Sequence, residues 1–321
     1  MNKEQEQFYN SLRDSGKFDK NQLDVIHWGF DDGLSSDQVA LYADPNYEWP
    51  QMHQIFVGLD YGLTSDQVRT FADPKYDVAQ MQEIFLGFER GLSTDQVALY
   101  TDPKFNDSQM SQIRFGFLDG LTTDQVRMYA NPIYDWPQMH QIFVGLDYGL
   151  TSDQVRMYAD PKFDSNQMEV IFWGFECGLN EDQVRMYADP KFNDFQMSQI
   201  ERGLQDGLSS DQVRMYADPK FEWQQMDDIR SGLSDGLTSD QVRMYADPKF
   251  EWQQMDNIRY GLSGGLTSDQ VALYADPKYD EFQMFDMCMK LEEQNAHKSK
   301  VQPERKSVRV KPPVQRTGKS R

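Results

Sequence analysis

The chain has 321 residues, of which 39% are hydrophobic, and it carries a net charge of −20 at neutral pH. This charge argues against a body that binds nucleic acid or anionic lipid over its surface, because a polyanion would be repelled. No apolar run of about 18 residues and no apolar signal-peptide core is present. We therefore expect a cytoplasmic protein that makes no membrane contact.

A 29-residue unit is repeated along most of the chain. A Gly-Leu pair recurs every 29 residues from Gly33 to Gly265 without insertion, which delimits nine tandem repeats over residues 33–294. Positions in each repeat are counted from this glycine. Residues 1–32 follow the pattern only in their second half and lack both the Gly-Leu and the Asp-Pro pairs. We interpret them as a degenerate N-terminal capping repeat, because an array of repeats needs a polar end.

The first half of each repeat predicts a short helix. Position 3 is usually Ser or Thr and position 6 is always Gln, which is the spacing of a capping box. Positions 7, 10 and 11 share one apolar face, as Val213, Tyr216 and Ala217 do in one repeat. Asp-Pro at positions 12 and 13 ends the helix, because the residue before proline disfavours helical geometry. The predicted helix has about two turns.

The second half of each repeat predicts a longer helix. Asp, Asn or Glu at position 16 stands three residues before Gln at position 19, again a cap pattern. Positions 20, 23 and 27 form its apolar face, for example Met226, Ile229 and Leu233. The glycine of the next repeat serves as a left-handed C-cap. Glycine at position 26 is expected to permit the close approach of an adjacent helix.

Together these units predict an all-α fold, an α-solenoid of about ten 29-residue helix-turn-helix repeats. One hairpin buries too little apolar surface to offset the entropy lost on ordering it, so the repeats must stack. Lys290 and Gln294 replace the glycines expected at the end of the last repeat, so the folded array should end near residue 294. Residues 295–321 are then expected to form a disordered basic tail.

No catalytic, cofactor-binding or metal-binding residue is predicted, and we expect a protein that is not an enzyme. Catalysis needs unlike groups that converge at one place, whereas the repeats present the same residues along a line. Cys177 and Cys288 lack metal-ligand spacing and are expected to be free thiols. His53 and His140 occupy the same repeat position and are expected to be plain surface residues.

Variation among the long helices indicates a candidate binding surface. Position 25 is apolar through the first two thirds of the array and lies about 140° around the helix from position 20, toward the outer face. Exposed apolar patches with aromatic residues mark interaction sites. The alternative is that these side chains pack between repeats. The candidate protein-binding residues, here called the apolar ridge, are Trp28, Val57, Leu86, Phe115, Val144 and Trp173.

The tail has the opposite charge from the rest of the chain, with nine Lys or Arg residues and one acid, Glu304. Such a segment binds phosphates with steep salt dependence. The candidate polyanion-binding residues are Lys298, Lys300, Arg305, Lys306, Arg309, Lys311, Arg316, Lys319 and Arg321.

Two functions therefore compete. The first is a non-enzymatic repeat scaffold that presents an extended surface for protein–protein binding to an unknown protein partner. The alternative is a nucleic-acid-associated adaptor that makes weak nucleic-acid contact through the basic C-terminal tail.

The repeat sequence GLTSDQVRMYADPKF, followed by Gln-Met, Ile and Gly, resembles short helical-hairpin repeats of bacterial proteins that are often associated with mobile elements. The resemblance covers about residues 4–294. It implies a cytoplasmic repeat protein, and because that family has no established activity, it implies no functional residues. The unit lacks the tetratricopeptide and ankyrin signatures, so the ligands of those families are not expected here.

Overall fold

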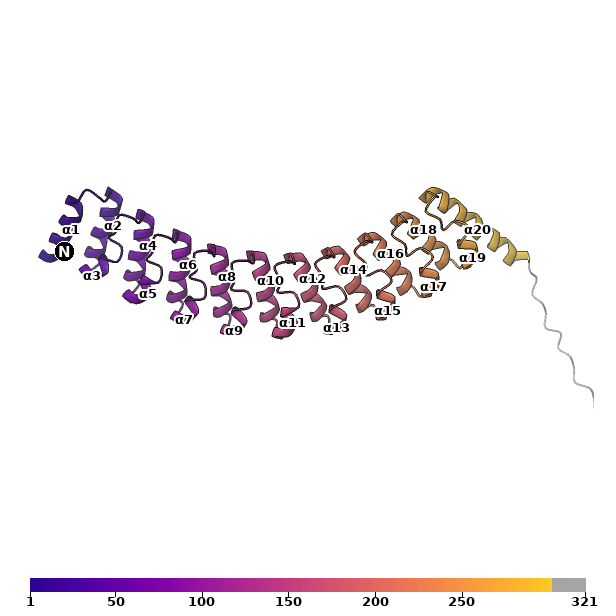
Figure 1. Ribbon diagram of the computed structural model, residues 1–321, viewed down its shortest axis with the longest axis horizontal. Helices are drawn as coiled ribbons and strands as arrows, with labels where there is room; N and C mark the ends of the chain where they lie inside the picture. Colours follow the sequence, from indigo (N-terminus) through magenta and orange to yellow (C-terminus); the bar gives the residue numbers. More distant parts are fainter. Residues whose placement is uncertain (302–321) are drawn as a thin grey trace, which may run out of the picture. The chain divides into compact units, whose positions relative to one another are not determined.

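The computed structural model describes the backbone of residues 1–301 and the side chains of residues 1–297. Every regular element in this part of the chain is an α-helix, and from α2 onward long and short helices alternate (Figure 1). The predicted all-α fold of stacked helical hairpins is therefore confirmed. The chain divides into two compact units, Met1–Glu201 and a second unit that begins at Arg202.

The boundary between the units falls within α14 (Asp194–Gln205). The helices before it are α1 (Lys3–Asp14), α2 (Lys20–Asp31), α3 (Ser36–Val39), α4 (Trp49–Asp60), α5 (Ser65–Arg69), α6 (Val78–Glu89), α7 (Thr94–Val97), α8 (Asp107–Leu118), α9 (Thr123–Val126), α10 (Trp136–Asp147), α11 (Ser152–Arg156), α12 (Ser165–Glu176) and α13 (Glu181–Val184). The helices after it are α15 (Ser210–Val213), α16 (Trp223–Ser234), α17 (Ser239–Val242), α18 (Trp252–Ser263), α19 (Ser268–Val271) and α20 (Glu281–Val301).

The long helices begin at the predicted caps. At α10 the Asp135 side chain accepts a hydrogen bond from the N–H of Gln138 (2.8 Å), and the Gln138 side chain accepts one from the N–H of Asp135 (2.9 Å). Where glutamate is the cap residue, as at Glu48, its N–H still donates to the side chain of Gln51 (2.8 Å). Position 19 therefore fixes the start of each long helix whichever residue precedes it.

The short helices also begin at the predicted caps, but the prediction of two turns was wrong. The α-helical segment of α11 has five residues and that of α9 has four. Beyond it the N–H of Tyr158 bonds the carbonyl of Val155, three residues back. This tighter spacing is typical of the last turn before a helix ends, and here it precedes the Asp-Pro pair.

The predicted apolar faces form the core. In the repeat that contains α10, the side chains of Met139 and Ile142 are fully buried. The side chains of Val155 in the following short helix and of Tyr158 just after that helix are also fully buried. The same four positions are fully buried through the array, apart from position 23 of the last repeat. The long helices α2, α4, α6, α8, α10 and α12 pack against one another in chain order, and α16, α18 and α20 do so in the second unit.

Glycine at position 26 permits the close approach that was expected, but the neighbour is a side chain and not a backbone. A Cβ atom built on Gly145 would lie 1.8 Å from the hydroxyl oxygen of Tyr158 and 3.2 Å from its Cζ. The tyrosine lies just after the next short helix, α11, and is fully buried. A glycine here is therefore required by the aromatic ring that lies against the long helix.

A series of hydrogen bonds from long helices to the following repeat was not predicted. The amide nitrogen of Gln138 donates to the carbonyl of Phe163 (2.6 Å), at position 15 of the following repeat. Gln138 is buried, so this bond forms away from water. We call the series the glutamine ladder. Its other recorded pairs are Gln22–Tyr47, Gln51–Tyr76, Gln80–Phe105, Gln109–Tyr134 and Gln167–Phe192 in the first unit, and Gln225–Phe250 and Gln254–Tyr279 in the second.

The two end repeats depart from the pattern. The first helix of the capping repeat, α1, has 12 residues and none of them is buried, as a polar end requires. At the other end α20 runs to Val301, past residue 294, where the array was expected to end. No glycine or proline interrupts residues 281–301, and the Asn295 side chain exchanges hydrogen bonds with Gln270 (2.9 and 3.2 Å).

The rest of the predicted tail, residues 302–321, lies outside the described residues. None of the helices in the described part of the chain combines the length and the apolar character that crossing a membrane would need.

Candidate functional site

The six residues of the apolar ridge occupy position 25 of α2, α4, α6, α8, α10 and α12, and all of them reach the surface. The side chains of Trp28, Phe115 and Trp173 are 45%, 48% and 47% exposed. Val57, Leu86 and Val144 are half-buried. The ridge therefore lies outside the buried core of the first unit.

Aromatic contacts connect the ridge to the neighbouring long helices. The Trp28 ring on α2 meets the His53 ring on α4 edge to face, with centroids 6.1 Å apart. His53 in turn lies 5.9 Å from Phe56. On α12 the ring centroids of Phe172 and Trp173 are 5.1 Å apart. The expectation that the histidine at this position is a plain surface residue was incomplete, because it is half-buried among aromatic rings.

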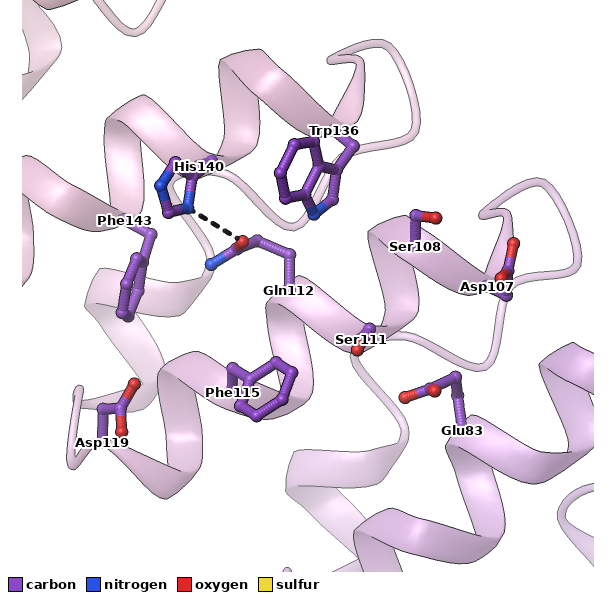
Figure 2. Close-up of a pocket in the computed structure, with 10 residues that line it drawn as sticks. All are labelled: Glu83, Asp107, Ser108, Ser111, Gln112, Phe115, Asp119, Trp136, His140 and Phe143. Atoms are coloured by element: carbon purple, nitrogen blue, oxygen red, sulfur yellow. Dashed lines mark hydrogen bonds between the residues drawn. The ribbon is translucent and has the colours of Figure 1, made fainter.

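An open hollow of about 440 Å³ lies between α8 and α10 on this face. We call it the α8–α10 pocket. Figure 2 shows Trp136, His140 and Phe143 of α10 on one side, Phe115 on α8, and Glu83 reaching in from α6. The residues that line it are Glu83, Asp107, Ser108, Ser111, Gln112, Phe115, Asp119, Trp136, His140 and Phe143.

A stacked set of rings forms the α10 wall of this pocket. His140 stacks on Trp136 with centroids 5.5 Å apart and planes 12° from parallel. Phe143 continues the stack on the other side of His140, at 6.1 Å and 28°. The Oε1 atom of Gln112 lies 3.3 Å from Nδ1 of His140 (Figure 2), which fixes the orientation of the ring. The buried amide of Gln112 therefore positions the aromatic wall.

One acid at the pocket is already neutralised. Arg114 is 8% exposed at its side chain, and its Nε donates to Oε2 of Glu83 (2.9 Å). The Arg114 guanidinium carbon also lies 4.6 Å from the centroid of the Phe115 ring. Within the described residues, neither Asp107 nor Asp119 forms an ion pair. The pocket thus combines aromatic faces with two uncompensated negative charges.

Two identical stretches of sequence, residues 49–69 and 136–156, show that the preceding helix determines whether this arrangement forms. In the second stretch His140 stacks on Trp136, whereas in the first His53 contacts Trp28 from the preceding helix. Position 22 of the preceding repeat also differs between the two copies. Gln112 stands there before His140 and forms a hydrogen bond with it, whereas Val25 stands there before His53 and cannot form one. The α8–α10 pocket is therefore not a repeated feature of the sequence.

No protein-family model, curated protein or solved structure matches the chain. The resemblance to bacterial helical repeats stays a prediction.

In the second unit the corresponding face carries charge. Position 24 holds Arg230 and Arg259, whereas in the first unit it holds Arg114 once and phenylalanine at Phe56, Phe85, Phe143 and Phe172. Arg259 contacts Asp228 (3.1 Å) and also pairs with Asp256. Arg230 contacts Asp206 (3.0 Å). Burial is the largest influence on Asp228 and raises the pKa of its carboxyl to about 7, although the nearby Arg259 acts in the opposite direction. At position 25, the position of the apolar ridge, this unit holds Arg202, Ser231, Tyr260 and Met289, of which Tyr260 is an exposed aromatic residue.

Other candidate chemistry is sparse. Cys177 is exposed and Cys288 is buried, and both are free thiols as expected. Among the described residues, no three His, Cys, Asp or Glu side chains are grouped so that they could hold a metal ion. Side-chain positions of the predicted polyanion-binding residues, from Lys298 to Arg321, lie outside the described residues.

Proposed function

We propose that this protein is a non-enzymatic binding scaffold, and that the ridge-bearing face of α2–α12 binds another protein. The observation that carries the proposal is the row of exposed aromatic side chains at Trp28, Phe115 and Trp173, joined by half-buried apolar residues. Stacked repeats commonly bind partners through such continuous surfaces. Two free cysteines fit a reducing compartment, which supports placing the protein in the cytoplasm.

The free energy available from burying these three aromatic side chains supports them as anchor residues for a partner. Each of the three retains nearly half of its surface, so burial by a partner would contribute roughly 1–3 kcal/mol per side chain. Interface residues of this kind, tryptophan above all, account for much of the binding energy in protein complexes. A contact that spans several repeats would use more than one anchor, which suits a partner that is itself extended.

Photo-crosslinking from defined positions tests the proposal. A photoreactive phenylalanine analogue is placed at position 173 of the full chain, and in a second protein at position 98, where Ala98 is the exposed C-cap residue of the short helix α7. Both proteins are irradiated in an extract of the source cells and the adducts are identified by mass spectrometry. We expect a defined protein adduct from position 173, and we expect that the protein labelled at position 98 does not form this adduct.

Competition with charge variants completes the test. The pair Phe115→Lys and Trp173→Lys adds two positive charges to the ridge, and Ala40→Lys with Ala98→Lys adds the same charge at exposed short-helix positions. The unlabelled ridge variant should fail to compete for the adduct, while the short-helix variant competes as well as the wild type. If both variants compete equally, the ridge does not form the binding surface.

A further inference from the structure

We propose that the α8–α10 pocket receives a lysine or arginine side chain from a peptide segment of the bound partner. This inference rests on the proposed binding function and names the chemistry that the partner must present. The pocket is formed entirely within the first unit, by α6, α8 and α10.

The aromatic walls suit a cation. The exposed faces of Trp136 and Phe115 line the pocket from opposite helices, and the negative face of an aromatic ring attracts a lysine ammonium or arginine guanidinium group within about 6 Å of its centroid. The same structure already shows this geometry once, because the Arg114 guanidinium lies over the Phe115 ring. A volume of about 440 Å³ accommodates one long basic side chain together with water.

Charge complementarity selects a cationic guest over a neutral one. Glu83 is paired with Arg114, and these two charges cancel. Asp107 and Asp119 line the pocket without an ion pair in the described part of the chain. The chain as a whole carries −20, so its field also draws basic segments toward the surface. An anionic or purely apolar segment would leave both carboxylates uncompensated.

The identical repeat copy provides an internal control. Trp49 and Trp136 have the same local sequence and nearly the same exposure, 45% and 44%. Trp136 stacks on His140, whose ring is held by the hydrogen bond with Gln112. In the other copy, His53 contacts Trp28 of the preceding long helix and not Trp49. Binding of a cationic side chain should therefore change the environment of the Trp136 ring and leave that of Trp49 unchanged.

The test uses the full chain with ¹⁵N-labelled tryptophan, whose six indole N–H groups report separately by NMR. Two heptapeptides are titrated that differ only at the central residue, arginine in one and its neutral isostere citrulline in the other. The arginine peptide should shift the Trp136 signal saturably and leave the Trp49 signal in place. The citrulline peptide should bind about tenfold more weakly or not at all.

Two variants separate the pocket from the rest of the face. Trp136→Ala and, independently, Asp119→Asn should each weaken the arginine peptide by about fivefold or more, whereas Trp49→Ala should not. Both pocket positions are exposed, and circular dichroism verifies that each variant is folded. Equal binding of the two peptides, or equal effects of Trp136→Ala and Trp49→Ala, would overturn the proposal.

Two further outcomes are distinguishable. If the Trp136 signal moves when the basic residues of 302–321 are replaced by glutamine in the full chain, the pocket is occupied by the chain itself and the proposal of a partner segment is overturned. If position 173 crosslinks a partner but the arginine peptide does not bind, the binding function stands and only the cationic guest is refuted. If the arginine peptide binds but position 173 gives no crosslink, the cation-binding pocket stands and the proposed protein contact at position 173 of the apolar ridge is refuted.

Discussion

The substitution Gly145→Ala places a methyl group in the space of the Tyr158 hydroxyl. The new Cβ would lie 1.8 Å from that oxygen, far inside contact distance, and the ring is fully buried and cannot swing aside freely. Overpacking of this kind costs about 3 kcal/mol, while alanine in a helix interior is favoured over glycine by about 1 kcal/mol. We expect a net loss of about 2 kcal/mol in the free energy of unfolding.

A double-mutant cycle isolates the cause. Tyr158→Phe removes the hydroxyl, whose hydrogen bond to the Gln141 carbonyl is long at 3.5 Å, so it alone should cost at most about 1 kcal/mol. Adding Gly145→Ala to Tyr158→Phe should then cost little more. Urea unfolding followed by circular dichroism measures all four proteins.

The identical repeat copy again supplies a matched control. Gly58 faces Phe71 in place of a tyrosine, and the nearest atom to a built Cβ is Cζ at 2.9 Å. Gly58→Ala should therefore lose less stability than Gly145→Ala, about 1 kcal/mol. If the two alanine variants are equally stable, or if Tyr158→Phe gives no relief, the steric explanation of the conserved spacing between glycine and ring is incorrect.

Two further changes test the glutamine ladder and the charged face of the second unit. Gln138→Leu should lower the free energy of unfolding by about 1–3 kcal/mol, because it leaves the Phe163 carbonyl and the N–H of the cap residue Asp135 without their partner. Gln283 is exposed, and its side chain makes only the cap hydrogen bond within the described residues. Gln283→Leu should therefore cost about 0.5–1 kcal/mol in the same urea assay. Asp228→Asn should raise stability at pH 8 by about 1–4 kcal/mol, because the folded carboxyl has a pKa of about 7, above its unfolded value, and is destabilising when ionised. That advantage should shrink as the pH falls from 8 to 5, where the wild-type carboxyl becomes protonated; an advantage that is constant across this range would contradict the burial argument.

The sequence was sufficient to predict the elements that local patterns specify. Capping boxes and apolar spacing located both helices of each repeat, and the buried side chains at Met139, Ile142 and Val155 are the ones predicted. The surface position of the ridge followed from helical geometry, although the choice between exposure and packing needed the structure. The length of the short helices was predicted wrongly, because hydrogen-bond spacing inside a turn has no clear signature in residue type.

Contacts between repeats were harder to predict. The acceptor of Gln138 is a backbone carbonyl 25 residues away, and any residue supplies one. The invariance of glutamine at position 19 was a signal, but the capping box alone accounted for it. The α8–α10 pocket depends on Gln112 and Arg114, whose partners lie on neighbouring helices. Position 22 is also Gln at Gln54, Gln141 and Gln199, and position 24 is also Arg at Arg230 and Arg259, so neither residue alone marks the pocket. A periodic pattern hides such residues, since it directs attention to what the copies share.

The constant offset of the glutamine ladder has a consequence for how this gene can change. Each rung joins residues 25 apart, so loss or gain of whole 29-residue units leaves every remaining glutamine with an acceptor in the next unit. The identical stretches 49–69 and 136–156 lie three units apart and offer a place where unequal recombination preserves the frame. Recombination between these two stretches would add or remove three hairpins together. The number of ridge positions would change, while the joints between the remaining hairpins stay hydrogen-bonded.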